Sequence, residues 1–364
     1  MLLAVSAIRV AILSISRKIS DKTMAGQPAS FILPMTEQQL EALGQQIVEA
    51  RAYIDPVYQQ MGRVVIGQHY LIERLLICLL SNGHVLLEGV PGLAKTTTIK
   101  ALSETLQAQF SRIQFTPDLL PSDVVGTLIY NPEEHKYFAK KGPIFANLLL
   151  ADEINRAPAK VQSALLEAMQ ERQVTLGDES FKLPEPFLVL ATQNPVDQEG
   201  TYPLPEAQLD RFMMKVEVGY GTEDEELEIL NLMASSSAKP KADAVLNLES
   251  LLYLRNLADS VYIDENVRRY IVKLVTATRD PKKYGKEMAQ YVRYGASPRA
   301  TINLTLAGKA HAFLEGRPFA TPHDIRAIAH DVLGHRILRT YEAEADEVTP
   351  RKIVDWVLDH VPVP

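Results

Sequence analysis

The sequence predicts an α/β fold in which a central parallel sheet lies between two layers of helices (an αβα sandwich), followed by a smaller all-α domain. Two patterns support this prediction. Short apolar runs typical of buried parallel strands alternate with helical patterns up to about Val218. Beyond Thr222 only helical patterns remain. We therefore expect an α/β domain over residues 35–221 and a helical domain over residues 222–364.

The composition is that of a globular chain with a mildly acidic balance. Its 364 residues are 46% hydrophobic, which is enough for two domains. The 38 Lys and Arg residues against 45 Asp and Glu residues give a net charge of −7, which argues against a nucleic-acid partner. Cys78 lies in an apolar helical run, where a core position is expected, and a single cysteine excludes an internal disulfide. This usage fits a reducing compartment, and we expect a cytoplasmic protein.

Residues 1–34 do not match a targeting signal. The stretch is apolar, but Arg9 lies in its middle and Arg17 and Lys18 follow it. A secretory signal places its charge first, and a membrane span needs about 20 apolar residues. We expect this extension to be poorly ordered or non-native, the functional chain to begin near Met35, and no stable membrane span. A weak membrane-surface anchor is the competing interpretation.

Two helices are expected before the first strand. Thr36 and Gln39 have the spacing of a capping box, and a mixed helical pattern continues over residues 40–58. The second helix lies within residues 67–80. Its apolar residues stand at positions 71, 72, 75, 76, 79 and 80, which form one face at helical spacing.

The stretch from His84 to Thr96 predicts a phosphate-binding loop between a buried strand and a helix. Backbone N–H groups freed by Gly89 and Gly92 can point at a polyphosphate, and the new helix adds its positive end. Lys95 would supply a charge for the β- and γ-phosphates of a nucleotide, and Thr96 a hydroxyl that holds Mg²⁺.

Ala94 stands where the strict G-x-x-x-x-G-K-[ST] pattern has its second glycine. Alanine has the smallest Cβ, so the loop is still expected to close. An ordinary Gly/Pro turn before a helix is the alternative. The expected nucleotide contacts are the following loop residues: Gly89, Val90, Pro91, Gly92, Leu93, Ala94, Lys95, Thr96 and Thr97.

A strand and an inserted hairpin are expected next. The strand lies over residues 111–115. Thr116 followed by Pro117 then predicts the start of a helix, because threonine caps helices and proline fits the first helical position. The segment 125–145 contains short apolar runs separated by turn-forming residues, which predicts a hairpin over residues 126–141.

Two adjacent carboxylates end the following strand. A strand that begins at Asn147 and is apolar from Leu148 to Ala151 leads directly to Asp152 and Glu153, and ligands gather at the C-terminal ends of such buried parallel strands. Asp152 is expected to orient Mg²⁺, and Glu153 to polarise the water that attacks the γ-phosphorus. Two exposed acids at the end of a surface strand are the alternative, which the upstream phosphate loop disfavours.

The α/β pattern continues to about residue 218. A helix over 158–171 is followed by a hairpin over 173–183 and by a buried strand over 187–194. Asn194 ends this strand, where it can hydrogen-bond a γ-phosphate or the lytic water, or form a turn before proline. A helix that ends in Leu209-Asp210-Arg211-Phe212 and a final strand complete the domain.

The helical part begins with a second capping box at Thr222–Glu225. Later helices are expected to begin where a cap residue precedes proline, at Ser297-Pro298, Thr321-Pro322 and Thr349-Pro350. The eight histidines are scattered without the spacing of a metal site, and we expect them on the surface or in the core.

Four motifs in this order resemble those of the MoxR family of AAA+ ATPases. The resemblance rests on Gly89–Thr96, Leu150–Pro158, Ala191–Pro195 and Leu204–Phe212, and Ala94 is itself typical of MoxR members. It covers nearly everything from about Gln39 to the C-terminus. It implies a P-loop AAA+ core followed by a helical lid.

The resemblance implies a role for each matching residue of the core. Lys95 and Thr96 correspond to the Walker A pair, and Asp152 and Glu153 to the Walker B pair. Asn194 corresponds to the polar residue called sensor 1.

The resemblance also implies roles for arginines. Arg211 resembles the arginine finger that reaches into a neighbouring subunit's site, and Arg299 resembles sensor 2 of the lid. A cation in the first turn of a helix is unfavourable unless it faces a phosphate. Without the motifs, both arginines would be interpreted as surface residues or salt-bridge partners. Arg156 is a further candidate for an intersubunit contact.

An arginine supplied in trans implies a site shared between two subunits. The resemblance therefore implies a ring homo-oligomer, usually a hexamer, which uses ATP and Mg²⁺ and acts on a client or co-operating protein, plausibly one with a von Willebrand factor A domain. The two hairpins correspond to insertions that face the pore or partner. The alternatives are a magnesium-chelatase-like subunit and a nucleic-acid motor, and the acidic balance disfavours the motor.

Overall fold

The computed structural model describes residues 36–364 apart from 91, 195–199 and 235–239. The expectations for residues 1–34 and for Pro91 therefore lie outside the described residues. The contacts group Thr36–Pro364 into one unit. Within the described ranges, the helices are too short or too polar to cross a membrane.

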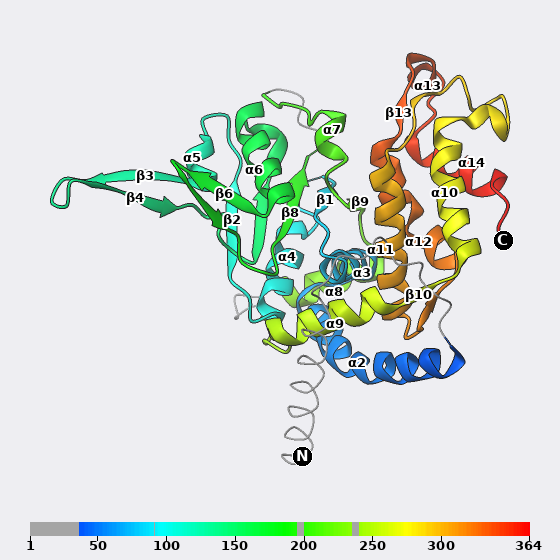
Figure 1. The fold of residues 1–364 in the computed structure, drawn as a ribbon, viewed down its shortest axis with the longest axis horizontal. Coiled ribbons are helices and arrows are strands. Elements are labelled where there is room, and N and C mark those ends of the chain that lie inside the picture. The colour runs from blue at the N-terminus through cyan, green and yellow to red at the C-terminus, as the bar shows by residue number, and fades with distance from the viewer. Residues whose placement is uncertain (1–35, 91, 195–199, 235–239) are drawn as a thin grey trace, which may run out of the picture. The chain divides into compact units, whose positions relative to one another are not determined.

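The predicted parallel sheet is present and contains five strands in the order β2-β5-β8-β1-β9 (Figure 1). The strands are β1 (Val85–Glu88), β2 (Phe110–Gln114), β5 (Leu148–Asp152), β8 (Leu188–Gln193) and β9 (Met214–Glu217). β5 is buried along its whole length, as expected of a strand covered on both faces. Because the strands are parallel, their carboxyl ends lie along one edge of the sheet.

Helices cover both faces of this sheet, which confirms the αβα sandwich (Figure 1). α6 (Ala159–Glu171) packs Val161 and Leu165 into a buried cluster with Leu149 of β5. Successive strand side chains point to opposite faces, so Leu150 faces the other layer, where α4 (Lys95–Thr105) contacts β5. Other helices of this part are α2 (Glu37–Val64), α3 (His69–Leu80) and α7 (Glu206–Leu209), with the 3₁₀ turn η1 (Ile154–Arg156).

The prediction of a helix that begins at Pro117 is wrong. α5 (Pro121–Val125) begins at the next proline instead. There the N–H of Leu120 donates to the Asp123 carboxylate at 2.8 Å. Either proline suits a first helical position, and the second one begins the helix because an acid in its first turn satisfies a free N–H group.

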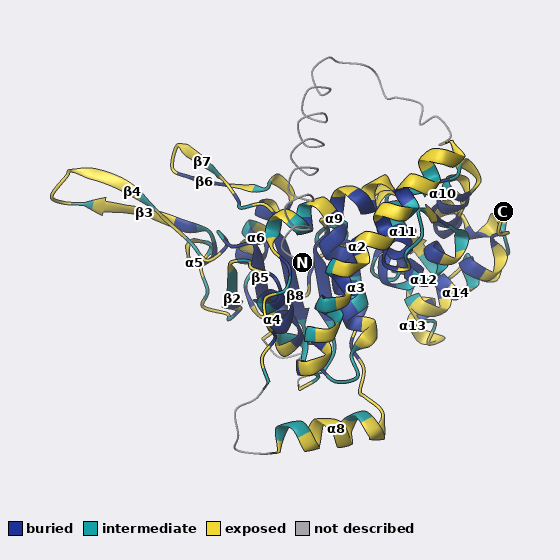
Figure 2. Cartoon of the chain, turned by 90° about the horizontal axis from the view of Figure 1, so that it is seen from below, coloured by how far each residue is buried: buried dark blue, intermediate teal, exposed yellow. Residues whose placement is uncertain are grey.

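Both predicted hairpins are present (Figure 2). β3 (Gly126–Asn131) pairs antiparallel with β4 (Lys136–Lys141), and β6 (Gln173–Leu176) pairs with β7 (Glu179–Lys182). Gly126 has a φ of 102°, and a Cβ there would lie 2.2 Å from the Lys140 carbonyl, so glycine is required at the base of the first hairpin. The first hairpin exposes several apolar side chains: Leu128, Ile129, Tyr130, Tyr137 and Phe138.

The C-terminal part is helical, as predicted. Ser297, Thr321 and Thr349 cap helices whose first residue is proline. The helices are α9 (Leu248–Ser260), α10 (Glu265–Arg279), α11 (Pro298–Leu314), α12 (Pro322–Leu333), α13 (Tyr341–Ala345) and α14 (Pro350–His360), with 3₁₀ turns η2 (Pro281–Lys283) and η3 (Gly334–Arg336).

Two pairs of short strands also occur in the C-terminal part, which the sequence pattern did not predict. β10 (Tyr262–Ile263) pairs with β12 (Phe319–Ala320), and β11 (Val292–Tyr294) pairs with β13 (Leu338–Arg339). Segments of two or three residues are too short to carry the alternation by which a strand is recognised.

None of the residues of α8 (Glu223–Met233) is buried. The predicted capping box between Thr222 and Glu225 is present, and the acidic first turn favours the helix through its dipole. Before α8 the N–H of Val218 donates to the end of β1, and after it the N–H of Leu246 donates to the end of α4. α8 therefore lies in a connection whose two ends, at Val218 and Leu246, are hydrogen-bonded to the α/β part (Figure 2).

Candidate active site

The loop between β1 and α4 closes with two residues in the left-handed region. Gly92 has a φ of 89° and Ala94 a φ of 56°. A Cβ on Gly89 would lie 2.6 Å from the carbonyl oxygen of Val218, so that position also needs glycine. Ala94 caps α4, and its carbonyl accepts the N–H of Thr98 at 2.8 Å. Alanine thus takes a conformation that glycine adopts more readily, at a cost of about 1 kcal/mol.

Lys95 and Thr96 begin α4 beside this loop. The Lys95 ammonium donates to the Gly89 carbonyl. Burial lowers the pKa of Lys95, against the opposing effect of the carboxylates of Asp152 and Glu153. The Thr96 hydroxyl donates to Oδ2 of Asp152 at 3.5 Å. A partly desolvated cation at a helix N-terminus suits an anionic ligand.

Asp152 is buried at the end of β5 and is held by neighbours from both adjacent strands. The Thr192 hydroxyl on β8 donates to its Oδ1 at 2.6 Å and accepts the N–H of Glu153 at 2.8 Å. Arg112 on β2 donates to its Oδ2 at 2.6 Å. Sequence reasoning did not single out Thr192 or Arg112. The only available signal was that polar residues interrupt the two apolar strands that flank β5.

Glu153 follows Asp152 in a left-handed conformation, with a φ of 55°. Its carboxylate accepts a hydrogen bond from Gln114 Nε2 at 2.9 Å and pairs with Arg156 Nε at 3.1 Å. A non-glycine residue in this region stores strain, which is common at functional sites. Gln114 was also missed from the sequence, whereas Arg156 was predicted to contact another subunit.

Residues from three predicted motifs line one pocket of about 290 Å³ at the carboxyl ends of β1, β5 and β8. Its lining residues are Gly92, Leu93, Ala94, Lys95, Thr96, Thr97, Asp152, Glu153, Thr192, Gln193 and Asn194. Gly89 and Val90 precede this lining. The Thr96 hydroxyl and the Asp152 carboxylate are oxygen donors of the kind Mg²⁺ prefers, so the residues fit that ion.

Arg211 and Arg299 do not line this pocket. Arg299 lies in the first turn of α11, as predicted, and its Nη1 donates to Oδ2 of Asp210 at 3.1 Å. The half-buried side chain of Arg211 makes no hydrogen bond or ion pair within the described part of the chain. The predicted roles of both arginines toward a nucleotide stay predictions.

His84 anchors the start of β1 to two neighbouring elements. Its Nδ1 accepts the N–H of Val189 on β8 at 3.0 Å, and its Nε2 lies 3.2 Å from the Met169 carbonyl at the end of α6. Burial lowers the pKa of this imidazole to about 3, and the charge of Arg172 acts in the same direction. The ring is therefore neutral, with Nε2 carrying the proton that reaches Met169.

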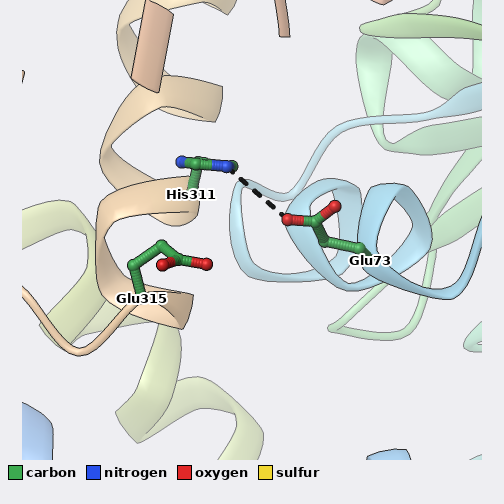
Figure 3. A group of neighbouring side chains, drawn as sticks. All are labelled: Glu73, His311 and Glu315. Atoms are coloured by element: carbon green, nitrogen blue, oxygen red, sulfur yellow. Dashed lines mark ion pairs between the residues drawn. The ribbon is translucent and has the colours of Figure 1, made fainter. Parts of the chain in front are cut away.

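A cluster of polar side chains outside the pocket lies at the contact of α3 with α11 (Figure 3). Possible ligand atoms of Glu73, His311 and Glu315 lie within 4.8 Å of one another. Nε2 of His311 is 3.5 Å from Glu73, and its Nδ1 is 2.7 Å from the buried carboxylate of Asp324. Glu73 also pairs with Arg74 at 2.9 Å. The imidazole therefore sits between two carboxylates and links α3 to α11 and α12. The scattered spacing of these residues hid the group from sequence analysis.

Two family models match the chain. Residues 84–214 match the ATPase family associated with various cellular activities (AAA), and residues 286–356 match an AAA lid domain. The first match contains the pocket, and the second begins just before α11 and includes η3.

Relatives and solved structures match across both parts. Chaperone MoxR1 of Mycobacterium tuberculosis is 47% identical over 306 residues, which cover 84% of this chain and 81% of that protein. Protein MoxR of Paracoccus denitrificans is 32% identical over 84% of this chain and 94% of its own length. The crystal structure of a Cytophaga hutchinsonii protein has 49% identity and a TM-score of 0.83, covering 90% of this chain and 99% of that one.

Proposed function

Because this chain belongs to the MoxR family of AAA+ ATPases, we propose that it binds ATP with Mg²⁺ in the pocket at the ends of β1, β5 and β8 and hydrolyses it. The observation that supports this most is the convergence of Lys95, Thr96, Asp152, Glu153 and Asn194 on that pocket. These residues come from three separate motifs, and each has the chemistry that its assigned role needs.

Each of these residues has a proposed role. Lys95 and the loop N–H groups bind the β- and γ-phosphates. Thr96 and Asp152 hold Mg²⁺, which when bound neutralises phosphate charge. Glu153 orients and polarises the attacking water, and Asn194 hydrogen-bonds that water or the γ-phosphate. The Thr192 hydroxyl keeps Asp152 and the backbone of Glu153 in place for these tasks.

We propose that the protein works as a ring, with six subunits as the expected number. Arg211 would enter the pocket of the neighbouring subunit, which agrees with its lack of a partner within the described residues. Arg299 would change partners between Asp210 and a nucleotide. Loss of the γ-phosphate would then alter both the subunit interface and the angle between the core (35–221) and the lid (222–364).

The proposed output is chaperone-like maturation or activation of another protein. The name of the Mycobacterium tuberculosis relative, a chaperone, supports this direction. The hairpin β3–β4 presents exposed aromatic residues, including Tyr137 at 68% exposure, and is the part we propose to contact the partner. A partner with a von Willebrand factor A domain is the first to test.

The catalytic role of Glu153 is tested with Glu153→Gln, which keeps the shape of the side chain and removes its basicity. This variant should bind ATP with about the affinity of the wild type and turn it over at least a hundredfold more slowly, as expected for removal of a general base. Retained turnover would remove Glu153 from its role.

The shared site is tested by mixing Arg211→Ala with Lys95→Ala. Each variant alone should be inactive. The mixture should regain part of the activity, because a Lys95→Ala subunit can place its Arg211 in the pocket of an Arg211→Ala subunit, where Lys95 is intact. Light scattering should show an oligomer. Full activity of Arg211→Ala as a monomer would exclude the ring mechanism while leaving the nucleotide site in place.

A further inference from the structure

The lid binds the carboxylate of Asp210, the residue directly before Arg211. The Ser297 hydroxyl, at the start of α11, lies 2.9 Å from both carboxylate oxygens. Arg299 Nη1 donates to Oδ2 at 3.1 Å, and Arg336 Nε donates to Oδ1 at 2.9 Å. Three lid side chains therefore share the two oxygens of one core carboxylate.

Arg336 also binds the main chain on both sides of Arg211. From η3, its guanidinium donates to the carbonyl of Asp210 at 3.1 Å, to that of Phe212, and to that of Met213 at 3.2 Å. The Arg336 side chain is 1% exposed. Burial lowers its pKa to about 10, against the opposing charge of Asp210, so it remains a cation at neutral pH.

This arrangement leaves Arg211 available. Its neighbour Asp210 is the nearest carboxylate along the chain, and the lid donors already occupy both of its oxygens. The Arg211 guanidinium accordingly has no partner among the described residues. The lid side chains thus bind Asp210 and the backbone around Arg211, and the Arg211 side chain keeps no partner among the residues that the structure describes.

The same segment continues into β9, which pairs with β1, the strand that leads into the phosphate loop. The N–H of Met213 donates to the His84 carbonyl at 2.7 Å, and β9 then pairs with β1 along its length. A movement of η3 would therefore shift the segment that presents Arg211, whereas β1 holds the far end of that segment against the sheet.

We propose that Arg336, acting with Asp210, is a positioning residue for Arg211. The lid of one subunit thereby fixes the position of the arginine that this subunit presents to its neighbour's ATP. The inference rests on the shared-site ring proposed above. It differs from a role of the lid in its own nucleotide pocket, because the defect of an Arg336 variant would appear in the adjacent subunit.

The test compares Arg336→Gln, Arg211→Ala and the control Arg326→Gln. Arg326 is a lid arginine of α12 that binds the Leu358 carbonyl and lies 3.6 Å from Asp359, far along the chain from the Arg211 segment. Arg336→Gln should lower kcat about tenfold to a hundredfold, a fraction of what a complete arginine finger contributes, and should change KM for ATP less than twofold. Arg326→Gln should keep wild-type kinetics.

Mixing separates positioning of Arg211 from a general structural role. A threefold excess of Glu153→Gln supplies subunits that cannot hydrolyse ATP but carry an intact Arg211 and Arg336. Turnover per Arg336→Gln subunit should rise severalfold in this mixture, as it should for Arg211→Ala. If Arg336→Gln does not fold by circular dichroism, the milder Asp210→Asn variant replaces it and should show a severalfold loss with the same rescue.

Three results would overturn the inference, and they are distinguishable. Rescue of Arg211→Ala without rescue of the Arg336→Gln or Asp210→Asn variant would place the defect in the variant's own site, leaving the ring intact. Full activity of Arg211→Ala would remove the shared site itself, and with it any function of Arg336 through Arg211. Unchanged kcat in Arg336→Gln would also exclude the positioning role.

Discussion

Acid should destabilise the protein through His84, and replacing this residue should remove part of that sensitivity. The neutral ring accepts the N–H of Val189 and reaches the Met169 carbonyl, inside a buried site. In the unfolded chain a histidine takes up a proton below about pH 6.5. In the folded chain the pKa of His84 is about 3, so the imidazole becomes protonated only at much lower pH.

The sign and size follow from this difference. The stability that His84 contributes is fully present above pH 6.5 and is lost progressively as the pH falls toward 3. Between pH 8 and pH 5 the loss is about 2 kcal/mol, because the unfolded state gains most of a proton that the folded state does not bind. His335, whose pKa burial also lowers, acts in the same direction and adds to the wild-type loss.

The variant His84→Gln keeps one donor and one acceptor but does not titrate in this range. Urea unfolding at pH 8 and pH 5, followed by circular dichroism, should show that the variant loses about 2 kcal/mol less than the wild type. The exposed His323 provides the control, since His323→Gln makes the same substitution at the protein surface. Equal losses in wild type and His84→Gln would refute the reasoning.

Three further predictions concern the pocket and the hairpin. Thr192→Val should destabilise the protein by about 1–3 kcal/mol and lower kcat at least tenfold, because it removes a buried partner of Asp152; unchanged urea unfolding would contradict it. Arg112→Gln should lower the Mg²⁺ concentration for half-maximal ATPase activity about threefold, because it removes a cation from Asp152; a Mg²⁺ titration that shows a rise would mean that Arg112 holds the carboxylate ready for the ion. Gly126→Ala should open the first hairpin to proteases while ATP binding persists, since its Cβ would lie 2.2 Å from the Lys140 carbonyl; an unchanged digestion pattern would exclude this.

The elements around the pocket were predictable because their signals are local. The strand before Lys95, the two acids after β5 and the cap–proline helix starts each lie within a few neighbouring residues. The same locality explains the error at Pro117, because two prolines within one short stretch offer equally good starts, and only the placement of Asp123 decides between them.

Contacts between distant segments could not be predicted in this way. Arg112 lies 40 residues from Asp152, and Arg336 lies 126 residues from Asp210. Their importance arises from the order of strands in the sheet and from the docking of η3, which no run of neighbouring residues encodes. The sequence around a lone arginine in a polar stretch looks the same whether the side chain is buried in such a contact or exposed to solvent.

The exposed helix α8 offers a place to attach a probe. None of its residues is buried, so a residue changed on it removes no core contact, and the chain before and after it is held at Val218 and Leu246. A fluorophore or an affinity tag within α8 would be tolerated as insertions at exposed segments usually are. Placed there, it would leave the ATP pocket and the contacts between Asp210 and Arg336 unmodified.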